Sequence, residues 1–418
     1  MSDTAQRSLG PNGDWLNAEP LRKVFAAFDA AHADVRAVGG AVRNSLMGRM
    51  VTEVDLATPL EPSDVITLAE KAGLSAHPTG IDHGTVTLVA NGTGFEVTTL
   101  RRDVETDGRH AVVAFATSWE EDARRRDFTI NALYCDADGA VYDPIGGLAD
   151  LRRHRVRFIG DAEARIREDY LRILRFFRFS AEYGSGRLDA DGVAAAVAMK
   201  DGLKRIAAER IGSEMMKLLA APHAAEVIKA MHQTGILGLV LTDHCDPGCL
   251  ARLEAIEAAL GQPPDALAGL AALAVSNPMH ARVIAERLRL SNADTEALRM
   301  AAAIHRKLDP SRSDAEARTV LYALGETAFR RAVRVAWARS EAPVSDAAWR
   351  RRALLADRWS PPRMPFGGSD VIALGIAAGP AVGKVLKAFE AWWIDNDFPR
   401  DRALQELELK ALVRKVLG

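Results

Sequence analysis

Apolar and polar positions change their spacing along the chain, and this change predicts a mixed first part followed by a long helical part. Four apolar residues near the start recur at three- and four-residue intervals: Leu21, Val24, Phe25 and Phe28. That spacing predicts a helix from Leu21 to about Ala33. Residues 34–38 favour a strand that runs into Gly39-Gly40, followed by a helix through Met47. From about residue 160 onward, helical spacing dominates and strand signals almost vanish.

Two hairpins are predicted in the first part. Residues 85–90 and 95–100 are β-rich runs joined by Asn91-Gly92-Thr93-Gly94, a strong turn signal. Residues 132–135 and 140–142 surround Asp138-Gly139 and close a mixed sheet by about residue 145. Between the hairpins, residues 101–110 are polar and charged, which predicts a mobile loop. Ser118 is placed to cap a short helix with three acidic residues in its first turn.

Composition and charge narrow the class of protein. Of the 418 residues, 48% are hydrophobic and 26% are charged, which is ordinary for a globular chain and predicts two to four compact units. No apolar run approaches the roughly 20 residues of a membrane span, and the first residues lack the apolar core of a secretion signal. Three cysteines form no disulfide framework. We therefore expect a cytoplasmic protein without a membrane partner.

The net charge is only −2, yet arginines cluster at 124–126, at 152–157 and along 165–178. Local basic stripes can bind a phosphate backbone even when the whole protein is nearly neutral. The alternative is that these arginines simply form a solvated surface.

Glu53 and Asp55 are the first candidate chemistry. The run Val51–Ala57 reads as a strand, and in a strand residues two apart project from one face. Two neighbouring carboxylates suit Mg²⁺, which one or two carboxylates and substrate phosphates commonly hold together. The Gly39-Gly40 turn ahead of a helix lets a backbone approach phosphates closely. Metal ligands beside a phosphate cradle favour nucleotidyl or phosphoryl transfer, although a solvated strand edge would carry the same pattern.

A second candidate is the amphipathic segment Glu168–Phe179. Its apolar positions predict a helix whose exposed side carries Asp169 beside Arg172, three residues apart, and then Arg175 and Arg178. A carboxylate next to a guanidinium offers acceptors and donors that match the edge of a base. An ordinary ion pair within the helix is the alternative.

Five ordered motifs resemble those of the class II tRNA nucleotidyltransferases, a family that contains the CCA-adding enzymes and the bacterial poly(A) polymerases. The motifs cover Gly39–Arg43, Glu53–Thr58, Arg125–Leu133, Asp143–Asp150 and Glu168–Phe179. The resemblance implies an α+β fold, with a small mixed-sheet polymerase-β-like head followed by a helical neck, body and tail. The expected boundaries are a flexible lead-in at 1–20, the nucleotidyltransferase head at 21–147, the neck at 148–220, the body at 221–320 and a tRNA-binding tail at 321–418.

The resemblance also implies a role for each matched residue. Gly39, Gly40 and Arg43 would contact the triphosphate, while Glu53 and Asp55 would hold the metals. Arg126 and Asp127 would engage the ribose. Asp169 and Arg172 would pair with cytosine or adenine, and Arg175 and Arg178 would support the phosphates. The first acid of this family's pair is usually Asp, so Glu53 should shift the metal geometry. Glu96 is the candidate for a third carboxylate on an adjacent strand, and a polar strand face explains it equally well.

The expected activity is addition of CCA to the tRNA 3′ end from CTP and ATP with Mg²⁺, by a monomer or homodimer. The segment 101–110 and a C-terminal stretch from Gly367 to Trp393 favour this reading, because relatives that stop at CC tend to lack the former. Two alternatives stay open: a poly(A) polymerase that extends RNA with ATP, and a catalytically silent RNA-binding protein.

Overall fold

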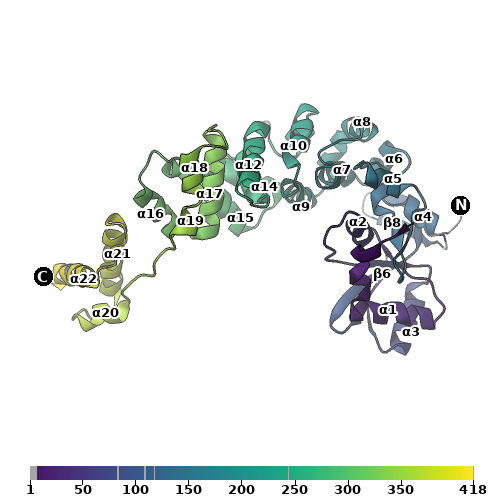
Figure 1. Ribbon diagram of the computed structural model, residues 1–418, viewed down its shortest axis with the longest axis horizontal. Helices are drawn as coiled ribbons and strands as arrows, with labels where there is room; N and C mark the ends of the chain where they lie inside the picture. The colour runs from purple at the N-terminus through teal and green to yellow at the C-terminus, as the bar shows by residue number, and fades with distance from the viewer. Residues whose placement is uncertain (1–6, 82–83, 108–109, 117, 243, 418) are drawn as a thin grey trace. The chain divides into compact units, whose positions relative to one another are not determined.

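The computed structural model describes residues 7–81, 84–107, 110–116, 118–242 and 244–417 (Figure 1). The chain divides into two compact units, residues 1–243 and residues 244–418. The first unit contains the strands and the second consists of helices in the part of the chain that the structure describes. The predicted combination of a mixed-sheet part and a helical remainder is confirmed. The finer division into neck, body and tail stays a prediction.

Eight strands of the first unit form one sheet in the order β1-β10-β9-β2-β3-β6-β5-β4. Within the described residues the strands of this sheet are β1 Arg7–Ser8, β2 Arg36–Val38, β3 Asp55–Thr58, β4 Ser75–Gly80, β5 Thr85–Ala90, β6 Thr93–Thr99, β9 Tyr134–Cys135 and β10 Ala140–Tyr142. Strands β3 and β6 pair in parallel, whereas their other neighbours pair antiparallel. The sheet is therefore mixed, as predicted.

The predicted hairpin between β5 and β6 is confirmed. Ala90 pairs with Thr93, and the two residues between them, Asn91 and Gly92, have φ angles of 49° and 79°. A two-residue turn with both φ angles positive matches the right-handed twist of its strands, and Asn-Gly adopts it at low cost.

One expectation for an irregular segment is wrong. The segment predicted as a mobile loop contributes to a second, two-stranded sheet of β7 Arg101–Asp107 and β8 His110–Phe115, with Arg101 opposite Phe115. The flexibility predicted for residues 1–20 stays a prediction, and the described part of this segment contains regular elements. There, β1 extends the main sheet beside β10, and Trp15 Nε1 donates to Ser45 Oγ at 2.7 Å. The partner of β1 is distant in sequence, whereas β7 pairs with the strand that follows it.

Helices pack on the sheet and continue beyond it in the first unit. In sequence order they are η1 Gly10–Asn17, α1 Glu19–Ala30, α2 Gly40–Leu46, α3 Pro62–Lys71, α4 Trp119–Arg124, η3 Thr129–Asn131, α5 Gly147–Arg152, α6 Ala162–Glu168, α7 Leu171–Tyr183, α8 Ala190–Met199, η4 Lys200–Arg205, α9 Ala208–Leu219, α10 Ala224–Gln233 and α11 Ile236–Val240. Ser118 stands at the N-cap position of α4, as predicted, but its side chain makes no capping hydrogen bond.

An aromatic cluster joins the sheet region to α7. Phe128 lies next to α4 in sequence, and its ring centroid is 4.9 Å from that of Phe158 and 5.2 Å from that of Phe179. Phe158 stacks on Phe176 at 5.5 Å. These rings are buried, so α7 is anchored to the segment that follows α4.

The second unit is helical throughout its described residues. Its elements are α12 Pro247–Ala259, α13 Ala266–Ala274, α14 Pro278–Leu288, α15 Asn292–Ile304, η5 His305–Leu308, α16 Asp314–Leu324, α17 Glu326–Arg339, α18 Ala347–Ala353, α19 Leu355–Arg358, α20 Gly368–Ala373, α21 Pro380–Asp395 and α22 Arg402–Leu417. Phe366, Phe389 and Trp393 are buried in a core near its C-terminal end. No helix among the described residues is long and apolar enough to cross a membrane.

Candidate active site

Asp55 and Glu96 lie side by side because of the parallel pair of strands. Leu56 of β3 is in register with Val97 of β6, so the residue before each is also a neighbour across the pair. Leu56 and Val97 are buried, whereas Asp55 and Glu96 are exposed. Side chains alternate between the two faces of a sheet. The two carboxylates therefore share the face opposite to the buried pair, and Glu96 occupies the place predicted for a third acid.

Glu53 does not belong to the strand that the sequence predicted. Strand β3 begins at Asp55, and Val51–Val54 are irregular. The expectation that strand periodicity aligns Glu53 with Asp55 is therefore wrong. Glu53 nevertheless lies within electrostatic reach of Asp55, because its negative charge contributes to the raised pKa of that carboxyl group.

The pKa of Asp55 is raised above its usual value. Surrounding protein atoms that displace water are the largest cause, followed by the negative charge of Glu96, while Arg126 opposes the shift. Within the described residues, no group of three or more His, Cys, Asp or Glu side chains is arranged as a ready metal cluster. Two exposed carboxylates with excess negative charge fit a hard divalent cation that takes its other ligands from water and substrate phosphates.

The Gly39 turn brings the backbone and Arg126 together beside these acids. Gly39 has φ +70°, and its N–H donates to Leu133 O at 3.0 Å before α2 begins at Gly40. A Cβ built at Gly39 would stand 3.4 Å from Asn131 O and 3.8 Å from Arg126 Nη1. A side chain at this position would therefore be strained and would crowd the turn. The backbone at Gly39 and the guanidinium group of Arg126 therefore lie close together at this turn.

Asp122 fixes the orientation of Arg126. Arg126 donates to Asp122 Oδ2 from Nε at 3.2 Å and from Nη2 at 3.0 Å, and Tyr134 OH donates to the same oxygen at 2.7 Å. Arg125 holds the other oxygen at 2.6 Å. Burial alone would raise the pKa of Asp122, but the charges of Arg126 and Arg125 outweigh it and lower the pKa to about 2. The sequence analysis placed Asp122 only among the three acids in the first turn of this helix and missed this role.

Arg43 lies inside the unit rather than at an open phosphate site. Its side chain is buried, and it donates to Asn131 Oδ1 through Nη1 and to Tyr183 OH through Nη2 at 2.7 Å. Burial lowers the pKa of its guanidinium. Arg43 also stacks on the Tyr183 ring at 3.9 Å. This burial does not favour the predicted direct contact with a triphosphate, and it gives Arg43 a supporting position behind the Gly39 turn.

Asn131 continues this network to α7. Its Nδ2 donates to Asp127 Oδ1 at 2.9 Å, and Asp127 Oδ2 accepts from Arg175 Nε at 2.8 Å and Nη2 at 2.5 Å. Burial opposes ionisation of Asp127, yet Arg175 and Asn131 hold its pKa below the usual value. A continuous chain of contacts thus runs from Arg43 through Asn131 and Asp127 to Arg175. Asn131 and Tyr183 were not among the predicted site residues.

The predicted base-selecting pair has a different local structure from the one expected. Helix α7 begins at Leu171, so Asp169 lies between α6 and α7 and not on a shared helical face with Arg172. Asp169 accepts from Leu171 N at 3.0 Å and from Arg210 Nη2 at 2.7 Å. Arg172 donates to Glu168 Oε2 and to Arg165 O at 2.9 Å. Asp169 and Arg172 therefore do not share a face as a pair, because a different residue holds each of them.

Arg178, predicted to support the triphosphate, donates to Glu214 Oε2 at 2.6 Å and to Glu182 Oε2 at 3.3 Å. Together with the Arg175–Asp127 contact, this means that both distal arginines of the row on α7 are engaged within the first unit. Their roles at a nucleotide stay predictions.

Comparisons with known proteins agree with this arrangement. A model of the poly A polymerase head domain matches residues 35–157, and a model described as a probable RNA and SrmB-binding site of polymerase A matches residues 187–245. The CCA-adding enzyme of Limosilactobacillus fermentum is 31% identical over 395 residues, which cover 92% of this chain and 94% of that protein. The mitochondrial CCA tRNA nucleotidyltransferase 1 of Danio rerio is 41% identical over 212 residues. That match covers 50% of this chain and 49% of the other, so the chain spans about half the length of several curated relatives it matches.

A solved structure extends the likeness over the whole chain. The crystal structure of the Bacillus stearothermophilus CCA-adding enzyme in complex with CTP superposes with a TM-score of 0.68 at 28% identity, covering 97% of this chain and 98% of that one. The matched head domain and the acidic site place this chain in the class of proteins that combine a poly A polymerase-type head with a helical remainder. Because the Limosilactobacillus fermentum likeness covers nearly both full lengths, the chain belongs to the family of CCA-adding enzymes.

Proposed function

We propose that this protein adds the 3′-terminal CCA to tRNA by sequential transfer of CMP, CMP and AMP from CTP and ATP, with release of pyrophosphate. The nearly full-length likeness to a CCA-adding enzyme carries the choice of product. The pairing of Asp55 with Glu96 beside the Gly39 turn supports nucleotidyl transfer as the chemistry. A head that matches the poly A polymerase model supports poly(A) synthesis equally well, so that activity is the second candidate.

The proposed reaction is in-line attack by the tRNA 3′-hydroxyl on the α-phosphorus of the nucleotide. A new P–O bond forms at the 3′-oxygen, the bond to the β-phosphate oxygen breaks, and pyrophosphate leaves. Asp55 and Glu96, with Glu53 beside them, would hold Mg²⁺, which would polarise the α-phosphate and favour loss of the hydroxyl proton. Arg126, held by Asp122, would face the phosphates over the Gly39 turn.

Base and sugar selection would fall to the start of α7 and the segment before it. Asp169 would accept hydrogen bonds from a base edge and Arg172 would donate to it. For this, Asp169 would release or share its contact with Arg210, and Arg172 its contact with Glu168. Asp127, oriented by Arg175 and Asn131, would accept from a ribose hydroxyl. Because Asp127 is buried and doubly held, the ribose would bind a preorganised acceptor.

The proposed partner of the protein is tRNA. The tRNA would be bound by shape and backbone along the arginine-rich helices, as is usual for double-stranded RNA. We propose a cytoplasmic enzyme that acts as a monomer or homodimer.

The test is extension of a tRNA transcript that lacks its last three nucleotides. Purified protein and Mg²⁺ receive CTP, ATP or both, and the products are sized on a sequencing gel. Two additions with CTP alone and a third with ATP support CCA synthesis. A long ladder with ATP alone would make the protein a poly(A) polymerase, and binding without extension would make it a silent RNA-binding protein. Replacing Mg²⁺ by EDTA in the same assay tests the metal requirement.

A further inference from the structure

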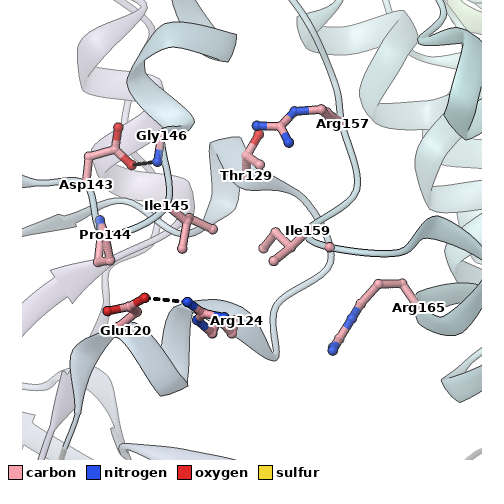
Figure 2. A pocket seen from close by; sticks show the side chains of 11 residues that line it. Glu120, Arg124, Thr129, Asp143, Pro144, Ile145, Gly146, Arg157, Ile159 and Arg165 are labelled. Carbon is pink, nitrogen blue, oxygen red and sulfur yellow. Dashed lines mark hydrogen bonds and ion pairs between the residues drawn. The ribbon is translucent and has the colours of Figure 1, made fainter. Parts of the chain in front are cut away.

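A separate cavity of about 720 Å³ opens on the other side of α4 from the candidate active site. Its walls come from α4, the turn after β10, the segment from Arg157 to Gly160 and the start of α6 (Figure 2). None of its lining residues belongs to the predicted active site. A volume in this range is typical of small-molecule sites.

Helix α4 separates the two sites by geometry. Asp122 of α4 faces Tyr134, and Arg126, which follows the end of the helix, donates to it beside the Gly39 turn. Glu120 and Arg124 of α4 line the cavity. Each of them lies two positions from Asp122, about 200° around the helix. A molecule in the cavity would therefore lie on the opposite side of α4 from Asp122, with Arg165 bordering Glu168, the partner of Arg172.

The wall formed by residues 143–147 is rigid. Asp143 accepts from Gly146 N at 2.9 Å, Gly147 N at 2.7 Å and Leu148 N at 2.9 Å. A Cβ at Gly147 would collide with Thr129 O, so the turn and η3 lie in close contact. This wall of the cavity is consequently held in place by its own backbone contacts.

Three guanidinium groups from three segments border this cavity. Arg124 is two-thirds exposed and meets Glu120 at 2.5 Å, Arg165 meets Glu168 at 3.0 Å, and Arg157 meets Asp150 through Nε and Nη2. Each guanidinium carries five N–H donors, more than these contacts use. Figure 2 shows Arg124 paired with Glu120 on one side of the cavity and Arg165 approaching from the other side.

The rest of the lining combines polar Glu120, Thr129 and Asp143 with an apolar part. Pro144 and Ile145 lie on one wall, with Ile159 across from them (Figure 2). Arginines beside apolar side chains match a ligand with a phosphate group at one end and a planar ring at the other. We propose that this cavity is an accessory site for one nucleotide unit, with its phosphate at Arg124 and Arg165 and its base against Ile145 and Ile159. The unit is either a free nucleotide or one nucleotide of a bound RNA strand.

The variant Arg124→Glu tests the site without touching the core, because Arg124 is exposed and its partner here is one helix neighbour. Lys23→Glu is the matched control. Lys23 is also an exposed cation paired four residues away, with Glu19 at 3.0 Å, and it lies outside the cavity. Arg124→Lys keeps the positive charge and should retain most of the binding. Thermal melts of all three variants should match the wild type.

Two measurements on the full chain distinguish the sources of the nucleotide. Equilibrium dialysis with radiolabelled ATP counts the free nucleotides bound per chain. If the ligand is a free nucleotide, Arg124→Glu lowers this number by one relative to wild type and Lys23→Glu leaves it unchanged. Because the result is a difference of one, it stands even if the proposed active site binds no nucleotide or adds no CCA.

If the ligand belongs to RNA, the ATP count stays the same and affinity for the truncated tRNA changes instead. Filter binding at several salt concentrations should then show a Kd at least fivefold higher for Arg124→Glu. The slope of log affinity against log salt should fall by about one. An unchanged ATP count together with an unchanged Kd and slope would overturn the proposal.

Discussion

Replacing Asp55 by Asn should stabilise the metal-free protein while it removes activity. Asp55 and Glu96 are neighbours on adjacent strands, which lie about 4.8 Å apart, so their carboxylates are separated by roughly 5–6 Å. Two like charges at that distance in a solvent-like dielectric repel by about 1 kcal/mol. Solvent screening applies because both side chains are exposed. Asn keeps the size of Asp and removes this repulsion.

The sign of the effect follows from the pKa of Asp55. The fold raises this pKa, so the ionised carboxylate is less favourable in the folded than in the unfolded chain. The cost is present at pH 7 and disappears as the pH falls through the pKa, where Asp55 becomes protonated. The gain from Asp55→Asn should therefore be visible at pH 7 and fade in acid.

Scanning calorimetry in EDTA measures the gain. For a unit of this size, about 1 kcal/mol corresponds to a rise of roughly 2–4 °C in the midpoint of its melting transition. Adding Mg²⁺ should raise the wild-type midpoint more than that of the variant, because the cation relieves the same repulsion. Glu70→Gln, at an exposed acid on α3, is the control and should change neither value. A variant that melts below wild type in EDTA, or that gains as much from Mg²⁺, would refute the metal assignment.

Three other predictions address the remaining contacts. Asn131→Ala should lower the free energy of unfolding by about 1–3 kcal/mol in a denaturant titration, because buried Asp127 and Arg43 each lose a partner; a loss no larger than that of an exposed Asn→Ala change would argue against the network. The low pKa of Asp122 should contribute about 2 kcal/mol of stability above about pH 4, lost between pH 4 and 2, and Asp122→Asn should remove that part of the pH dependence of stability. Arg172→Ala should blur the choice between CTP and ATP in single-turnover incorporation, and retained selectivity would dismiss its role at the base.

The sequence predicted correctly a turn and a hairpin that depend on residues close together in the chain. Alternation of apolar residues with an Asn-Gly turn predicted the β5–β6 hairpin, and the Gly39-Gly40 turn was placed correctly ahead of α2. The family motifs pointed to Arg126, which lies near the Gly39 turn, but did not point to Asp122. The family resemblance made Glu96 the candidate for a third carboxylate, and the register of β3 and β6 places it beside Asp55.

Features that depend on contacts in the folded chain were missed. The pairing of β1 with β10 joins segments far apart in sequence, and the polar, charged strand β7 pairs with the apolar strand β8 that follows it. Asp122 was noted only as an acid in the first turn of a helix, because its contacts with Arg126 and Tyr134 become apparent only when the chain folds. The start of α7 was placed too early, since hydrophobic spacing continues through the break at Asp169.

The parallel pairing of β3 and β6 has a consequence for synthesis of the chain on the ribosome. The two neighbouring acids are separated by a crossover containing α3, β4 and β5, so neither strand alone assembles the acidic pair. The nascent chain should therefore gain affinity for a divalent cation late in its synthesis. This requires that Glu96 has left the exit tunnel and that β6 has paired with β3. Nascent chains halted before β6 should show no Mg²⁺-dependent protection from protease, whereas chains long enough to expose the whole sheet should show it.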